Sequence, residues 1–134
     1  MSELTALGRE IKWALDASDV ARHPGDPRQS GIYGTILYDE LGPGHQRNVA
    51  VFADGEVDRS PCGSGTSARM ALLDLPPGAT FTHDSIIGTR FTARVVETVP
   101  EGVVTEVEGT AHRTAEHTFV LDPRDPLREG FVLR

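Results

Sequence analysis

Residues 58–66 read Asp58-Arg59-Ser60-Pro61-Cys62-Gly63-Ser64-Gly65-Thr66 and join two runs of different character. The run before them, Asn48 to Phe52, is rich in residues that favour strands. The run after them, Thr66 to Leu75, is rich in helix formers and ends at Pro76, which cannot continue a helix. We therefore predict that the Cys62 thiol lies between a strand and the N-terminus of a short helix.

This arrangement suits a small zwitterionic ligand, which carries one positive and one negative group. Gly63 and Gly65 let the backbone approach a ligand closely, and the N–H groups of a first helical turn attract a carboxylate. The helix dipole also favours the thiolate of Cys62, so the sulfur could act as a general base near neutral pH. Asp58 is a fitting partner for a substrate ammonium group.

Other interpretations of the same residues are open. An isolated cysteine is often a buried apolar filler. A Cys-His nucleophile is a further option, as is a metal site built from His83 and Asp84 or from two later histidines. No known motif of either kind is present, so we expect structural or exposed histidines and no metal. The histidines considered as bases are His45, His83, His112 and His117.

The N-terminal part of the chain predicts a helix followed by a hairpin. Apolar residues recur at helical spacing from Leu4 to Leu15. A strand is predicted from Ile32 to Leu37, and the Gly42-Pro43-Gly44 break joins it to the strand at Asn48 to Phe52.

The C-terminal part predicts further strands. Together with the helices they indicate an α+β domain in which antiparallel β-structure wraps round a central helix. The tail from Asp122 to Arg134 contains two prolines and is predicted to be extended, crossing to a neighbouring unit. The predicted strands lie around Phe81 and at Thr89–Val99, Val103–Gly109 and Ala111–Leu121.

Composition narrows the class of protein. The 134 residues suffice for one domain, and 38% hydrophobic with 25% charged residues is ordinary for a soluble protein. A net charge of −7 argues against a nucleic-acid partner. No membrane span or secretory signal is recognisable, so a cytoplasmic location is expected. The single cysteine, Cys62, excludes an intrachain disulfide and a Cys-based zinc cluster within one chain.

The stretch DRSPCGSGTSARM, residues 58–70, closely resembles the second active-site motif of the proline racemase family. The likeness extends to segments on both sides and covers nearly the whole chain. These segments are residues 30–34, 48–55, 83–91, 119–123 and 129–131.

The resemblance implies a two-base mechanism without a cofactor, in which one thiol removes the α-proton of a proline-type amino acid and another supplies a proton on the opposite face. Cys62 is then the second thiol and Asp58 contacts the substrate nitrogen. Backbone groups at Gly63 and Ser64 hold the carboxylate, and Phe52 lines the ring pocket.

The chain departs from the family in length. Full-length members are more than twice as long, and the Met-Cys-Gly-His segment with the first thiol is absent. The family fold has two lobes, as in diaminopimelate epimerase, so residues 1–134 correspond to a partial C-terminal lobe whose tail, 122–134, packs on another lobe. An expressed fragment or misassigned start is the favoured account; a partner chain, or a homo-oligomer with two facing copies of Cys62, would also complete the site.

Three functions follow from the resemblance. The first is racemisation or epimerisation of proline or hydroxyproline. The second is dehydration of trans-3-hydroxyproline, but related dehydratases usually carry Thr at the position of Cys62. The third is a non-catalytic remnant that binds a small zwitterion or assembles with another chain. The sequence leaves the choice of proline derivative open.

Overall fold

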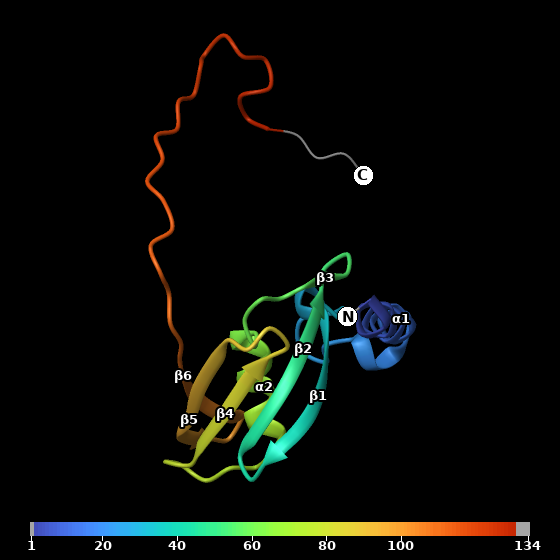
Figure 1. The fold of residues 1–134 in the computed structure, drawn as a ribbon. Coiled ribbons are helices and arrows are strands. Elements are labelled where there is room, and N and C mark those ends of the chain that lie inside the picture. Colours follow the sequence, from blue (N-terminus) through green and yellow to red (C-terminus); the bar gives the residue numbers. More distant parts are fainter. Residues whose placement is uncertain (1, 131–134) are drawn as a thin grey trace.

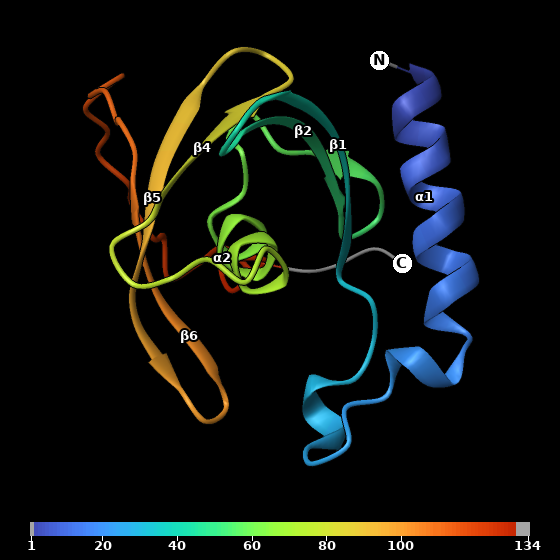
Figure 2. The ribbon, with the colours of Figure 1, turned by 90° about the horizontal axis from the view of Figure 1, so that it is seen from below.

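A computed structural model of the chain describes residues 2–130 and contains a mixed sheet of six strands with two α-helices. The strand order is β1-β2-β4-β5-β6, and the short β3 pairs with β2. Figures 1 and 2 show the sheet curving round α2, which it encloses on one side. The elements are α1 Ser2–Asp16, η1 Asp19–Ala21, η2 Pro27–Gln29, β1 Gly34–Gly42, β2 His45–Phe52, β3 Glu56–Val57, α2 Gly63–Leu72, β4 Thr80–Ser85, β5 Arg90–Val99 and β6 Gly102–Glu108.

The predicted N-terminal helix is confirmed as α1, and it lies on the outer face of the sheet. In Figure 2, α1 and α2 lie on opposite sides of β1 and β2. Gly8 is the buried residue of α1 and faces Val51 of β2. A Cβ atom at Gly8 would lie 2.7 Å from Val51 Cγ2, so the close approach of helix and strand requires glycine here.

The predicted hairpin is also confirmed. β1 and β2 pair antiparallel with Gly34 opposite Phe52, and the register shifts between Glu40 and Gly42. β1 begins two residues after the predicted Ile32, but both strands continue past their predicted limits on the turn side, because the ladder reaches almost to Gly44.

The expectation of an antiparallel sheet is wrong for one pair of strands. β2 and β4 are parallel, with His45 opposite Thr82. The chain leaves β2, forms α2 and returns beside β2 in the same direction, which is the crossover that parallel neighbours require. The other strand pairs are antiparallel.

The helix α2 begins and ends three residues before the predicted Thr66–Leu75. Gly63, Ser64 and Gly65 are poor helix formers in general, but they occupy the first turn, where the intrahelical bonds begin. The inner face of the sheet packs on this helix through a small apolar core. Its buried members are Met70, Phe81, Ala93 and Val95.

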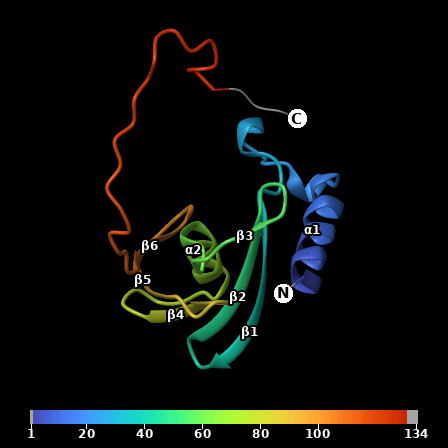
Figure 3. The same cartoon turned by 45° about the horizontal axis from the view of Figure 1, so that its top comes forward.

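The strand predicted at Ala111–Leu121 is wrong, because this segment has no regular secondary structure. Figures 1 and 3 show it running away from the sheet. Phe119 is 91% exposed, and a β-prone sequence forms a strand only where a partner strand or a packing surface is present. The tail was predicted to be extended from Asp122, but 122–130 forms turns; 131–134 lie outside the described residues.

Within residues 2–130, no helix is both long enough and apolar enough to cross a membrane.

Candidate functional site

Cys62 occupies the N-cap position of α2, where its backbone φ is +68° and ψ is +111°. Two short-range hydrogen bonds shape the preceding loop. The Ser60 N–H donates to Asp58 Oδ1 over 2.8 Å, and the Cys62 N–H donates to Ser60 Oγ over 3.1 Å. Asp58 therefore holds the loop as well as facing the pocket.

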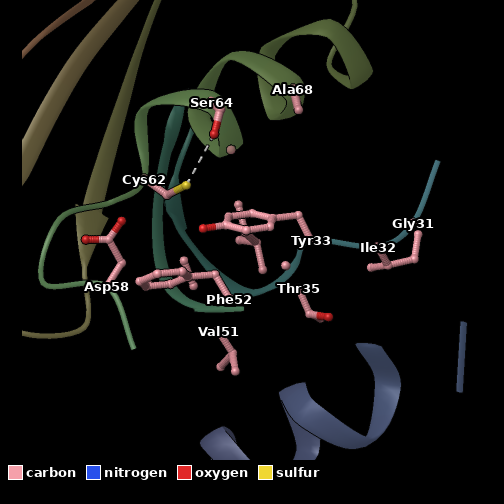
Figure 4. Close-up of a pocket in the computed structure, with 14 residues that line it drawn as sticks. Gly31, Ile32, Tyr33, Thr35, Val51, Phe52, Asp58, Cys62, Ser64 and Ala68 are labelled. Carbon is pink, nitrogen blue, oxygen red and sulfur yellow. Dashed lines mark hydrogen bonds between the residues drawn. The ribbon is translucent and has the colours of Figure 1, made fainter. Parts of the chain in front are cut away.

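A pocket of about 520 Å³ lies beside the Cys62 thiol. Strands β1 and β2, the loop at Asp58 and the first turns of α2 form its walls (Figure 4). The lining residues are Gly31, Ile32, Tyr33, Gly34, Thr35, Ile36, Ala50, Val51, Phe52, Asp58, Cys62, Ser64, Gly65 and Ala68.

Four of the predicted site residues meet at this pocket: Phe52, Asp58, Cys62 and Ser64. Gly63 is not among the lining residues, so its predicted role rests on its backbone alone. The Thr66 N–H donates to the Cys62 carbonyl over 2.8 Å and is the first helical hydrogen bond. The N–H groups of residues 63–65 precede it and have no intrahelical acceptor, so they are available to an anion.

Gly65 lines the pocket and also has a packing role that the sequence does not predict. A Cβ atom there would overlap Ile36 Cδ1 of β1 and lie 3.2 Å from the Cys62 sulfur. Glycine at this position lets α2 approach β1 and leaves room for the thiol. The Cys62 sulfur itself lies 3.7 Å from Ser64 Oγ, a contact drawn in Figure 4.

Two aromatic residues line the pocket: Phe52, which the sequence predicts, and Tyr33, which it does not. Tyr33 stands beside Phe52 with ring centroids 6.0 Å apart, and Figure 4 shows both rings on the side of the pocket facing Cys62 and Ser64. The hairpin register gives the signal: Gly34 pairs with Phe52, so the residue before Gly34 lies next to that ring. Tyr33 is 72% exposed, which leaves this wall open to solvent.

His83 does not line the pocket, so it does not act on the Cys62 sulfur directly. It is fully buried, with Nδ1 2.9 Å from Thr66 Oγ1 and Nε2 2.9 Å from Asn48 Nδ2. Burial is the main cause that lowers the pKa of His83 to about 4; the nearby Arg69 contributes to this shift and Asp84 opposes it. The imidazole is therefore neutral at pH 7, and both ring nitrogens already have partners.

None of the other histidines considered as bases lines the pocket. His45 Nε2 lies 2.8 Å from Asp84 Oδ2, and Arg90 donates two hydrogen bonds to the same carboxylate. These donors hold the pKa of Asp84 well below its usual range. His112 and His117 lie on the exposed tail. No cluster of three or more His, Cys, Asp or Glu suited to a metal ion occurs in the described part of the chain.

These features define an α+β unit in which one thiol stands at the N-terminus of an enclosed helix, beside a partly apolar pocket that also holds a carboxylate. The chain belongs to the proline racemase family, because the family model described as "Proline racemase" matches residues 1–132.

Within the matched region, curated relatives are identical to the chain at about two fifths of the positions. A trans-3-hydroxy-L-proline dehydratase of Bacillus thuringiensis is 42% identical, over 99% of this chain and 43% of that protein. A 3-hydroxyproline 2-epimerase of Burkholderia multivorans is 41% identical, over 100% of this chain and 43% of that protein. The chain therefore spans less than half the length of these relatives.

Two solved structures share the fold. A hydroxyproline epimerase of Agrobacterium vitis, with bound trans-4-hydroxy-L-proline, has a TM-score of 0.77 and 34% identity. The match covers 98% of this chain and 40% of that one. A probable proline racemase of Agrobacterium radiobacter, with bound carbonate, has a TM-score of 0.80 and 28% identity, over 98% of this chain and 41% of that one.

Proposed function

We propose that this chain supplies the second thiol of a cofactor-independent racemase or epimerase acting on proline or hydroxyproline. The observation that carries the proposal is the position of Cys62, which faces the pocket from the N-terminus of α2. Asp58, Ser64 and Phe52 line the same pocket and supply three kinds of contact: charge, hydrogen bonding and apolar packing.

The pocket walls match the parts of a cyclic amino acid. The N–H groups at residues 63–65 would receive the carboxylate, because they point out of the first helical turn. Asp58 would face the ring ammonium, and the ring would pack against Phe52. The thiolate of Cys62 would then take the α-proton, while the oriented N–H groups stabilise the charge that develops on the carboxylate.

Inversion of the α-carbon needs a proton donor on the opposite face, and Cys62 is the one cysteine of the sequence. We propose that the first thiol comes from residues outside this sequence, from a partner chain or from a second copy of Cys62. In the first case the chain is a partial domain equivalent to the C-terminal lobe of a two-lobed, diaminopimelate epimerase-like fold, and its tail packs on the other lobe.

Dehydration of trans-3-hydroxy-L-proline is the second candidate, favoured by the name of the Bacillus thuringiensis relative. In that reaction a base removes the α-proton, the 3-hydroxyl leaves as water after protonation, and a carbon–carbon double bond remains. A proton need not be delivered to the opposite face. The thiol at position 62 therefore supports inversion more directly, since inversion uses a group that titrates on each face.

The test is α-proton exchange with the chain in D₂O. L-proline, trans-4-hydroxy-L-proline and trans-3-hydroxy-L-proline are followed by proton NMR, which detects α-deuterium and loss of water. Cys62→Ser is expected to reduce exchange about 100-fold or more, the usual contribution of a general base. Ala71→Ser adds the same hydroxyl at an exposed position of α2 and should leave exchange unchanged.

The outcomes separate the candidates. Exchange without loss of water supports the racemase or epimerase, and loss of water from the 3-hydroxy substrate supports the dehydratase. Exchange that survives Cys62→Ser would exclude Cys62 as the base. A folded chain that exchanges no substrate would favour the non-catalytic remnant.

A further inference from the structure

We propose that Asn48, Thr66 and His83, here called the His83 network, are positioning residues that hold the Cys62 backbone in the conformation its chemistry requires. The proposal rests on the proposed function, in which Cys62 is the reacting base. It goes further because it assigns a task to three buried residues that do not line the pocket.

The His83 network binds the carbonyl groups of both Pro61 and Cys62. Thr66 Oγ1 lies 2.7 Å from the Cys62 carbonyl oxygen, which also accepts the Thr66 N–H over 2.8 Å. Asn48 Nδ2 donates to the Pro61 carbonyl over 2.7 Å. The peptide units on the two sides of the Cys62 α-carbon are therefore each tied to a buried side chain.

The donor and acceptor roles in the His83 network can be assigned in one way. Thr66 has a single hydroxyl proton, and the Cys62 carbonyl accepts it. Thr66 Oγ1 must then accept from His83, so Nδ1 of His83 carries the proton and Nε2 is an acceptor. Asn48 Nδ2 lies 2.9 Å from Nε2 and 3.4 Å from Nδ1, so its N–H donates to the nearer, unprotonated Nε2.

The Asn48 amide cannot reverse this assignment. Rotating it would turn Oδ1 toward the Pro61 carbonyl oxygen, so that two acceptors would face each other. A protonated imidazole is equally unsuitable, because its Nε2–H would face the Asn48 donor. The network therefore needs a neutral His83 with its proton on Nδ1.

The backbone of Cys62 explains why such a network is needed. A φ of +68° with a ψ of +111° lies outside the regions that residues with a Cβ favour. Such a conformation persists only where the surrounding structure fixes it. Without the bonds to the neighbouring carbonyls, Cys62 can relax to an ordinary φ and carry its sulfur away from the helix N-terminus.

The surroundings of the network make packing alone a poor explanation. Thr66 and His83 are fully buried and Asn48 is 2% exposed, with the Phe81 ring centroid 5.1 Å from that of His83. Apolar side chains of similar size would fill this volume without the cost of burying polar groups. The charged groups that act on His83 are Arg69 on α2 and Asp84 on β4.

Alkylation of the single thiol by iodoacetamide tests the proposal without substrate or turnover. Thr66→Val removes the hydroxyl and keeps the shape, while Thr66→Ser keeps the hydroxyl. Thr105→Val is the matched control, because Thr105 Oγ1 also bonds α2, through Ser67 Oγ at 2.8 Å, away from Cys62.

The thiolate is the species that is alkylated, so moving the sulfur away from the helix N-terminus in Thr66→Val is expected to lower the alkylation rate at pH 7 about fivefold or more. Thr66→Ser and Thr105→Val should stay within about twofold of the parent. A Thr66→Val alkylation rate equal to that of the parent, or an equal effect of Thr105→Val, would overturn the proposal. Because no turnover is involved, this failure is distinguishable from a failure of α-proton exchange.

A second measurement needs no variant. In ¹⁵N-labelled protein at pH 7, two-bond ¹H–¹⁵N spectra report which ring nitrogen of His83 carries the proton. The network requires protonated Nδ1 and unprotonated Nε2. Finding the other tautomer, or an imidazolium, would overturn the proposal even if Thr66→Val failed to fold.

Discussion

On β4, His83 and Asp84 are neighbours in sequence, yet they point to opposite faces of the sheet. His83 faces α2, is fully buried and meets uncharged partners, Asn48 and Thr66. Asp84 is also buried, but its carboxylate meets His45 and Arg90, whose side chains are 31% and 58% exposed. The inner face thus holds a neutral network, and the outer face holds an Arg90–Asp84 ion pair that reaches solvent.

The difference shows how burial selects the chemistry of a polar group. On the inner face, charge would be costly, so the histidine stays neutral and its hydrogen bonds fix geometry. On the outer face, the partly solvated Arg90 guanidinium compensates the buried Asp84 carboxylate, which stays ionised. The two residues therefore respond to acid in different pH ranges.

The largest expected effect comes from removing apolar contact on the inner face. Met70 is fully buried against the core, whereas Leu72, two residues later on α2, is 78% exposed. Met70→Ala should lower the free energy of unfolding by about 2–5 kcal/mol, and Leu72→Ala by about 0.5 kcal/mol or less. Urea denaturation followed by circular dichroism measures both. Similar losses in the two variants would contradict the assignment of the inner face as the core.

A smaller effect comes from the protonation of His83. Its pKa is lowered to about 4 in the folded chain, so the unfolded chain binds more protons between that value and about 6.5. The contribution of neutral His83 to stability is therefore fully present above about pH 6.5. As the pH drops to about 4, the free energy of unfolding should fall by about 2–3 kcal/mol. Urea midpoints measured across this range should flatten in His83→Gln.

The matched control for this pH range is His112→Gln, which removes an exposed histidine on the tail. It should keep the pH dependence of the parent. If His83→Gln loses stability between pH 6.5 and 4 as steeply as the parent, His83 is not the residue responsible.

The smallest effect is expected at Asp84. Its pKa is lowered, chiefly by Arg90, so its charged interactions stabilise the fold above the usual aspartate pKa and lose this contribution as the pH falls toward the lowered value. Asp84→Asn should cost about 1 kcal/mol at pH 7. The gap between parent and variant should begin to narrow below about pH 4 and continue to shrink toward the lowered pKa. A gap that stays constant down to pH 2 would mean that charge does not contribute.

Much of the fold was predictable because local signals were strong. The helical spacing of α1 and the Gly42-Pro43-Gly44 turn located the first helix and the hairpin. The parallel pairing of β2 and β4 was missed, because strand direction depends on where the α2 crossover returns the chain. The strand at Ala111–Leu121 was wrong, because β propensity does not reveal whether a partner strand is present.

The residues of the site were likewise predictable where the signal was local in sequence. Cys62, Asp58 and Ser64 lie within seven residues of one another, so the motif itself brought them together. Tyr33 depended on the hairpin register, which a sequence defines only approximately. The pairing of Asn48 with His83 joins β2 to β4 and required the parallel register that the sequence did not indicate.

Because the tail is exposed and irregular, we expect proteases to cut the backbone after β6 first. Residues 109–121 are exposed and lie outside any strand ladder, the condition under which a backbone fits a protease cleft. A cut after Arg113 would release the apolar segment at Phe119 and leave the sheet, α2 and the thiol pocket uncut. Digestion thus offers a way to separate the exposed apolar surface from the thiol site without altering a single residue of the pocket.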